Sequence, residues 1–157
     1  ATMTFEGEAR ALGALTAYGV EFVVTRHGPV GSLAEAAALR GVKSGDIVKT
    51  LVVRRGEGDH LFVLVPGDRE FSWPKLRALL GVNRMTMPGA DEALAVTGYE
   101  RGTITPFGSL RALPVIADES VAGRRISLGA GAHGVAVTLG GDDVIRVLDA
   151  TVADISD

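Results

Sequence analysis

The chain has 157 residues, no cysteine and a net charge of −3 at pH 7, with 46% hydrophobic and 22% charged residues. This length suits a single domain over residues 1–157 with one full hydrophobic core. The absence of cysteine excludes disulfides and thiolate chemistry, and the negative charge argues against broad binding along nucleic acid. No apolar stretch approaches the ~20 residues of a membrane span and no secretory signal opens the chain, so we expect a soluble, cytoplasmic protein without membrane association.

The spacing of apolar residues predicts alternating helices and short strands. In the first helix, Phe5, Ala9, Leu12 and Thr16 share one face. In chain order the sequence predicts a helix over 5–19, a strand over 21–25, a helix over 33–40, strands over 47–53 and 61–65, a helix over 73–80, a strand over 84–87, a helix over 90–96, strands over 113–117, 125–128 and 135–139, a helix over 143–148 and a strand over 151–155.

Local signals predict where several of these elements begin and end. Ser32 is expected to cap the second helix, with Glu35 completing a capping box, and Gly41 is expected to end it. Asp142 is expected to cap the last helix. The stretch 56–59 supplies a hairpin turn. Several strand connections are too short for parallel crossovers. We therefore expect an α/β (α+β type) fold with a mixed, partly antiparallel sheet, curled toward a barrel, and flanking helices.

Lys49 is the charged residue within the predicted strand 47–53. Alternation places it on one face with Ile47, Leu51 and Val53, in an otherwise apolar row. Burying an ammonium is costly, so it needs a polar cavity, a partner or a route to water. One reading is an edge-strand residue that blocks aggregation. The other is a fixed cation in a pocket for an anionic or carbonyl-bearing ligand.

Two glycine-rich stretches stand between the later predicted elements. Residues 129–134 match G-x-G-x-x-G, but a strand follows instead of the helix that a dinucleotide fold requires, so we reject that reading. Their N–H groups could bind an oxyanion, or the stretch could be a plain hairpin turn. Residues 98–108 predict an ordered loop, and such loops often carry function.

The three histidines are isolated in sequence, and none forms a metal-binding motif, so no metal or other cofactor is expected. His133 lies in the glycine stretch, where a solvated turn residue is the ordinary alternative to a functional one. No G-x-S-x-G motif is present, which argues against an ordinary serine hydrolase.

Taken together, residues 47–53, the G-x-x-x-P-F-G pattern over 102–108 and residues 127–139 resemble the YbaK/EbsC/ProX family of aminoacyl-tRNA deacylases. This family also occurs as a domain inserted in bacterial prolyl-tRNA synthetases. The resemblance runs in order from about residue 32 to 155. It implies a curled mixed sheet, and hydrolysis of the ester between a wrong amino acid and the terminal ribose of tRNA.

The resemblance also implies site residues. Lys49 matches the family's key lysine and Gly102 the glycine of its substrate loop, and the Lys49–Thr50 pair resembles the cysteinyl-tRNA-Pro branch. That branch usually has a basic residue where Ala132 and His133 stand. We expect catalytic roles for Lys49, Gly102 and His133, the last as a fallback base. The expected substrate-binding residues are Thr50, Thr103, Pro106, Phe107, Gly108, Gly129, Gly131 and Gly134.

The hypothesis is therefore trans-editing of mischarged tRNA, with tRNA-Pro carrying Cys, Ala or another small amino acid as substrate. Lys49 would orient the terminal adenosine, and backbone N–H groups of the glycine loops would stabilise the oxyanion. The partners would be the aminoacyl-tRNA acceptor end and prolyl-tRNA synthetase. A non-hydrolytic acceptor-end binding module and a small-molecule ester or thioester hydrolase remain the alternatives.

Overall fold

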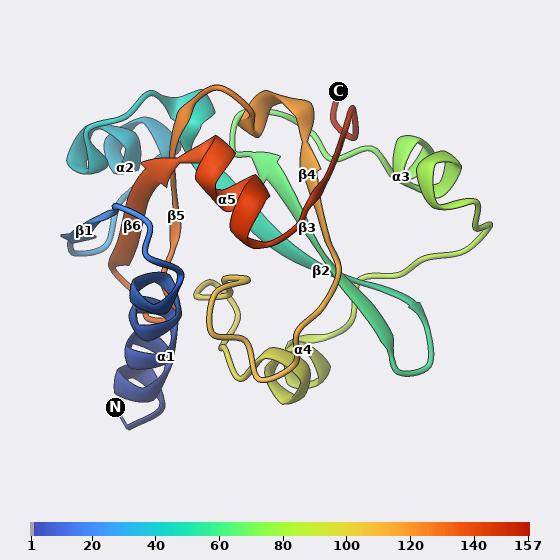
Figure 1. Cartoon of the computed structure of the whole chain (residues 1–157), viewed down its shortest axis with the longest axis horizontal. Coiled ribbons are helices and arrows are strands. Elements are labelled where there is room, and N and C mark those ends of the chain that lie inside the picture. The colour runs from blue at the N-terminus through green and yellow to red at the C-terminus, as the bar shows by residue number, and fades with distance from the viewer. Residues whose placement is uncertain (1) are drawn as a thin grey trace.

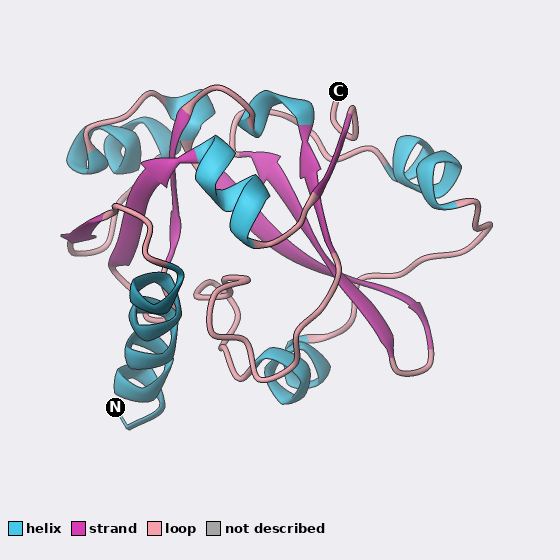
Figure 2. Cartoon of the chain, viewed as in Figure 1, coloured by secondary structure: helices cyan, strands magenta, loops and turns pink. Residues whose placement is uncertain are grey.

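Two small sheets form the centre of the fold (Figures 1 and 2). The computed structural model describes the backbone of residues 2–157 and the side chains from Glu6 onward. The first sheet has the order β1-β6-β5 and the second the order β2-β3-β4-β7. The strands are β1 (Val23–Arg26), β2 (Val48–Gly56), β3 (Asp59–Pro66), β4 (Val115–Asp118), β5 (Arg125–Gly129), β6 (Val135–Gly140) and β7 (Thr151–Ala153).

The pairing of the strands confirms the mixed, partly antiparallel sheet structure. The first sheet is antiparallel throughout. In the second, β2 and β3 form an antiparallel hairpin, whereas β3, β4 and β7 run parallel. The strands divide into two sheets. A parallel bridge between Ile47 and Ser127 joins them, next to the start of β2.

The helices pack around these sheets. Figure 1 shows α5 in front of the sheets, α2 beyond the first sheet, α3 beyond the second, and α1 and α4 below. No helix within residues 2–157 combines the length and apolar character that a bilayer crossing requires. The helices are α1 (Thr2–Tyr18), α2 (Leu33–Arg40), α3 (Trp73–Leu80), α4 (Ala90–Thr97) and α5 (Gly141–Val147), with short 3₁₀ turns at Ser44–Asp46 and Glu119–Val121.

Alternation along β2 divides its side chains between two cores. Val48 and Val52 join the main core with the inner faces of β3, β4, β5 and β6. Leu51 and Val53 pack on the other face of the second sheet, where α3 contributes Leu76. The predicted alternation of side chains along this strand is therefore confirmed, and Thr50 lies on the side of the main core.

The helix caps agree with the sequence in part. Ser32 Oγ accepts from the Glu35 N–H, and Gly41 ends α2 with a left-handed φ of 70°. The capping box is incomplete, because the Glu35 carboxylate accepts from Gly31 N–H at 2.9 Å instead of from Ser32 N–H. The predicted cap at Asp142 is wrong: α5 begins at Gly141, two residues before the predicted start, with Gly140 at the cap position, and Asp142 Oδ1 accepts from Gly123 N–H at 2.9 Å.

Two further predictions are corrected by tertiary structure. In α1 the buried side chains are Ala11 and Leu15, whereas Ala9 and Thr16 are exposed; the Phe5 side chain lies outside the described side chains. The predicted strand 84–87 is absent from the described chain. Thr86 alone pairs there, in a bridge to Arg54.

A buried carboxylate at the end of β4 binds the C-terminal segment through hydrogen bonds. Asp118 accepts hydrogen bonds from Ile155 N–H at 3.1 Å and Ser156 Oγ at 2.9 Å, in addition to two bonds from Ser120. Burial would raise the pKa of Asp118, but these hydrogen bonds to the ionised form lower it below its usual value. The ionised carboxylate therefore stabilises the folded chain.

Candidate functional site

A cavity of about 580 Å³ opens beside β2. Its size lies in the range of small-ligand sites, roughly 300–1,000 Å³. It brings together β2, the end of α2, the approach to α4, the loop after α4 and the end of β5. The lining residues are Arg40, Ile47, Val48, Lys49, Thr50, Leu51, Val52, Met87, Pro88, Gly89, Ala90, Ala93, Arg101, Gly102, Ile104 and Gly129.

The cavity exists because β2 is an edge strand whose free side is paired at two points. Ile47 bridges to Ser127 at one end, and Arg54 to Thr86 at the other. Arg54 N–H and C=O both bond Thr86, at 2.8 and 3.0 Å. Because peptide groups alternate in direction along a strand, those of residues 48, 50 and 52 face the same free side. Between the bridges, β2 thus presents backbone donors and acceptors to the cavity.

Thr50 is the polar side chain that β2 turns toward the main core. Its Oγ1 is buried and has no hydrogen-bond partner in the described structure. Buried hydroxyls usually find a partner, and Thr50 as a residue lies in the cavity lining. The structure therefore brings the predicted residue Thr50 into the site.

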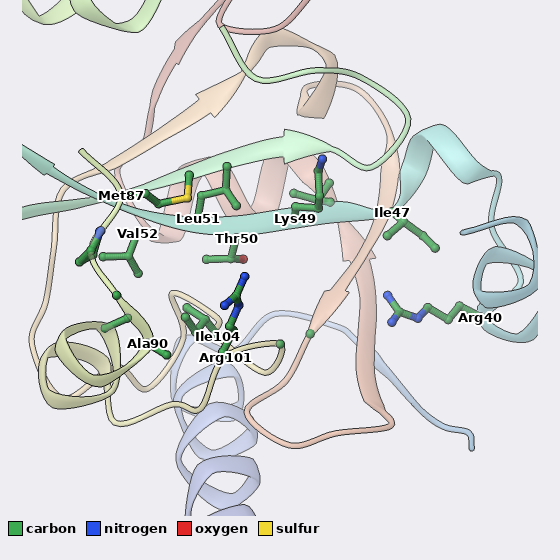
Figure 3. A pocket seen from close by; sticks show the side chains of 16 residues that line it. Arg40, Ile47, Lys49, Thr50, Leu51, Val52, Met87, Ala90, Arg101 and Ile104 are labelled. Carbon is green, nitrogen blue, oxygen red and sulfur yellow. The ribbon is translucent and has the colours of Figure 1, made fainter. Parts of the chain in front are cut away.

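The charged residues in the lining are all cations: Arg40, Lys49 and Arg101. None has a carboxylate within ion-pair distance among the described side chains, although several arginines elsewhere do. The cavity is also polarised. Figure 3 shows Arg40 at one end, Met87 and Ala90 at the other, and Arg101 between them, pointing at Thr50. A negatively charged, partly apolar ligand suits this arrangement.

Lys49 lines the cavity, but its side chain is exposed and not enclosed as expected. In Figure 3 its ammonium extends away from Thr50 and Arg101, on the opposite side of β2. The alternation that placed Lys49 opposite Thr50 is correct. The main core and the guanidinium of Arg101 lie on the Thr50 side, however, so the ammonium points away from the interior of the cavity.

Gly102 lies in the cavity wall, in a turn closed by a hydrogen bond from Thr103 N–H to Glu100 C=O at 2.9 Å. Its φ of 88° is positive, as glycine permits at the third position of a turn. No hydrogen bond of its N–H is present within the described chain. Gly102 can therefore offer a backbone donor to a ligand.

The glycines of the second loop divide into two groups. Gly129 lines the cavity. Gly131 and Gly134 lie outside its lining, and both have positive φ. A Cβ on Gly131 would lie 2.4 Å from the carbonyl oxygen of Gly7, and one on Gly134 would lie 2.4 Å from that of His27. The structure thus gives these two glycines packing roles in place of cavity contacts.

The other residues predicted from the Gly102 loop also lie outside the lining. Thr103, Pro106 and Phe107 are buried. The Thr103 carbonyl accepts from Gly131 N–H at 3.1 Å and so ties the two loops together. Gly108 has no room for a Cβ, which would lie 2.4 Å from Arg10 O. These residues support the Gly102 turn from outside the cavity lining.

Tyr99 anchors the same loop. Its hydroxyl donates to Phe107 O at 2.5 Å, and Arg10 lies over its ring, 4.8 Å from the centroid. Burial raises the pKa of Tyr99 to about 12. The phenol therefore stays protonated at neutral pH and serves as a donor within the loop.

His133 lies next to the site but not in the cavity lining. Its ring is exposed, and Nε2 lies 3.6 Å from a carboxylate oxygen of Glu100. A Cβ on Gly102 would meet His133 Cε1 at 3.4 Å, so the imidazole stands behind the turn. Among the described residues, no Asp, Glu or His lines the cavity, so the position of His133 does not support its expected role as a base.

Sequence reasoning missed Arg40, Arg101 and the wall formed by residues 87–90. Arg40 is the last residue of α2, where a basic residue usually serves the helix terminus, and its cavity contact needs the tertiary structure. Arg101 had a signal, because it directly precedes Gly102. No cluster of three or more potential metal ligands is present among the described residues.

The sequence of this chain is similar to those of known proteins. Residues 27–147 match the family model described as the aminoacyl-tRNA editing domain. The proline–tRNA ligase of Pelobacter propionicus is 32% identical over 113 residues, which cover 72% of this chain and 20% of the ligase. This chain thus spans about one fifth of that enzyme's length.

Two relatives resemble this chain over most of their length. EbsC of Enterococcus faecalis, named as a candidate Cys-tRNA(Pro)/Cys-tRNA(Cys) deacylase, is 28% identical over 117 residues, covering 74% of this chain and 71% of EbsC. The crystal structure of a candidate trans-editing enzyme for prolyl-tRNA synthetase superposes with a TM-score of 0.86 at 26% identity, covering 96% of this chain and 97% of that one.

Proposed function

Because this chain belongs to the aminoacyl-tRNA editing domain family, we propose that it hydrolyses the ester between a wrong amino acid and the terminal ribose of tRNA. The relatives favour tRNA-Pro as the substrate tRNA, cysteine as one amino acid that is removed, and prolyl-tRNA synthetase as the enzyme whose errors are corrected. We extend the proposal to Ala or another small amino acid. We also propose that residues 1–157 act as one editing domain.

The polarised cavity is the observation that carries this proposal. Its apolar end, with Val52, Met87 and Ala90, suits a small side chain, and its cationic end suits the nucleotide (Figure 3). The ester would then lie between them, near Thr50 and Gly102. Because one methylene is worth only ~1–3 kcal/mol in binding, the apolar end would discriminate mainly by excluding larger side chains.

The chemistry follows from the groups around the ester. Water adds to the carbonyl carbon, the bond from that carbon to the ribose oxygen breaks, and the ribose oxygen takes up a proton. Gly102 N–H would stabilise the negative charge that develops on the carbonyl oxygen. Among the described residues, neither a carboxylate nor an imidazole lies in the cavity lining. The neighbouring ribose hydroxyl of the substrate would therefore activate the water.

Lys49 would hold the terminal adenosine once its side chain, which extends away from Thr50 in the free protein, turns toward the cavity. Its exposed side chain has four rotatable bonds and no carboxylate partner in the described structure, so it is available to the substrate's ribose or phosphate. Loss of this contact would misplace the ester, and a small misplacement of the reacting atoms can cost about 100-fold in rate.

The test measures ester loss from tRNA-Pro charged with cysteine, alanine or serine. Wild type should turn over at least one of these and leave prolyl-tRNA-Pro intact. Lys49→Ala should lower kcat/KM by at least ~100-fold. Lys43→Ala is the matched control, because Lys43 is exposed and outside the cavity lining. Equal rates for Lys49→Ala and wild type would refute the role of Lys49. Stoichiometric binding without turnover would replace the hydrolase with a binding module.

A further inference from the structure

We infer that Arg40 and Arg101 form a two-arginine clamp for the phosphodiester groups at the end of the tRNA substrate, and that His27 positions Arg40. This inference rests on the proposed function, and it concerns the part of the substrate that does not react. It assigns the two arginines to binding of the polynucleotide and leaves the ester to the groups around Thr50 and Gly102.

The location of Arg40 at the C-terminal end of α2 does not explain where its side chain lies. A basic residue at a helix C-terminus ordinarily extends into solvent near the last carbonyls. The Arg40 side chain instead reaches into the cavity and is half-buried (Figure 3), and burial lowers its pKa from the usual value. A partly buried cation without a counter-ion is costly, so a bound anion would complete this site.

His27 supplies the contact that orients Arg40. His27 Nδ1 lies 2.9 Å from Gly28 O, and a ring nitrogen next to a carbonyl carries the proton. Nε2 is then an acceptor, and Arg40 Nε lies 3.4 Å from it. This contact occupies the inner nitrogen of the guanidinium and leaves both terminal nitrogens for a ligand. His27 itself is not in the cavity lining.

Arg101 enters the same cavity from the Gly102 turn. Its guanidinium points at Thr50 in Figure 3. The adjacent acid does not pair with it, since a carboxylate oxygen of Glu100 lies 3.6 Å from His133 Nε2 and no ion pair joins Glu100 to Arg101 among the described side chains. Two arginines from distant parts of the chain thus converge on one cavity, and neither has a carboxylate partner within the described structure.

The chemistry of the substrate decides which anion they bind. An aminoacyl ester has no free carboxylate, and its amino group is cationic. The negative charges of the substrate are therefore its phosphodiesters. Two planar guanidinium groups match phosphate oxygens by paired hydrogen bonds. A clamp confined to one cavity also explains how a chain with net charge −3 can bind the end of an RNA.

The experiment compares two substrates that share the ester but not the phosphates: charged tRNA-Pro and the same amino acid esterified to adenosine. Arg40→Gln and Arg101→Gln should each raise KM for the tRNA ~10-fold or more, with a clearly smaller loss of kcat/KM on the adenosine ester than on the tRNA. His27→Phe should raise KM for the tRNA without lowering kcat. Arg146→Gln is the control for loss of charge, because Arg146 lies on α5 outside the cavity lining.

A second measurement tests the clamp without turnover. A fluorescent CCA-ended oligonucleotide with a 3′-aminoacyl amide should bind wild type more tightly than either arginine variant by ~10-fold, and each variant should reduce the slope of log K against log salt by about 0.7. Unchanged affinity in variants with wild-type melting temperatures would overturn the clamp, as would equal losses on both ester substrates. If wild type hydrolyses neither ester, the proposed function fails, and this binding result still decides the clamp.

Discussion

Two glycines of one loop, Gly129 and Gly131, should respond in opposite ways to the addition of a methyl group. The sequence assigned both to the substrate, but in the structure Gly129 lines the cavity and Gly131 packs against α1. The change to alanine at each position therefore separates a binding role from a folding role within three residues of chain.

For Gly131→Ala, both backbone conformation and packing are unfavourable. Its φ is 85°, which costs an L-residue ~1–2 kcal/mol. The new Cβ would lie 2.4 Å from the carbonyl oxygen of Gly7 and 2.8 Å from the Tyr99 ring, so α1 must shift, at ~1–3 kcal/mol more. A loss of about 2–5 kcal/mol lowers the melting temperature of a chain this size by roughly 5–15 °C.

Gly129→Ala should hardly change the stability of the fold. The nearest atoms to the new Cβ are the carbonyl oxygens of Ile104, at 3.7 Å, and Thr103, at 3.9 Å, both ordinary contacts. Stability should change by no more than ~0.5 kcal/mol. The methyl group stands at the cavity wall, however, and should lower kcat/KM for the charged tRNA.

Thermal unfolding followed by circular dichroism measures the first effect, and ester loss per folded molecule measures the second. Gly131→Ala should retain wild-type activity below its melting temperature. The reasoning is refuted if Gly131→Ala melts with wild type, or if Gly129→Ala is fully active while Gly131→Ala is folded and inactive.

Three further changes should act through contacts that the structure defines. Asp118→Asn should cost about 1.5–3 kcal/mol at pH 7 by weakening charge-assisted hydrogen bonds. Because the pKa of Asp118 is lowered in the folded chain, its carboxylate contributes to stability at pH values above the unfolded pKa of ~3.9. This contribution is lost as the pH falls through the folded pKa. In denaturant titrations at decreasing pH, the free energy of unfolding of Asp118→Asn should therefore fall less steeply than that of wild type. Tyr99→Phe removes the hydrogen bond to Phe107 and should cost about 1–2 kcal/mol by the same titration. Ala90→Leu fills the apolar end of the cavity and should reduce hydrolysis of cysteinyl-tRNA more than that of alanyl-tRNA, and equal effects on the two would contradict the assignment of that end.

The strand of Lys49 shows how far the sequence could predict this site. Alternation correctly divided its residues, with Val48 and Val52 in one core and Leu51 and Val53 in the other. Alternation says which residues share a face, however, and not what lies opposite that face. The exposed position of Lys49 depends on where α4 and the Gly102 loop lie, and these are tertiary facts.

The other differences have the same origin. Residues 84–87 have strand-like composition, but a strand needs a partner along its length, and the free side of β2 offers one only at Arg54. Arg40 and Arg101 belong to different predicted elements, so no local pattern joins them. The sequence marks both glycine loops, but only the positions of neighbouring backbone atoms and of the cavity lining show which glycines face the cavity.

The net charge of −3 is the feature of the composition that is hardest to reconcile with an RNA substrate, and the distribution of the charges explains it. Many basic residues are neutralised where they stand, as in the pairs of Arg55 with Asp59 and Arg146 with Asp143. Such pairs leave little field to attract an RNA duplex along its length, and the net charge of −3 repels it. The cations of the cavity lining have no such partners, and they surround a space too small for a duplex. Under the proposed function, the same chain would reject most of an RNA molecule and bind its single-stranded end, which is the selectivity that an editing enzyme acting on the acceptor end requires.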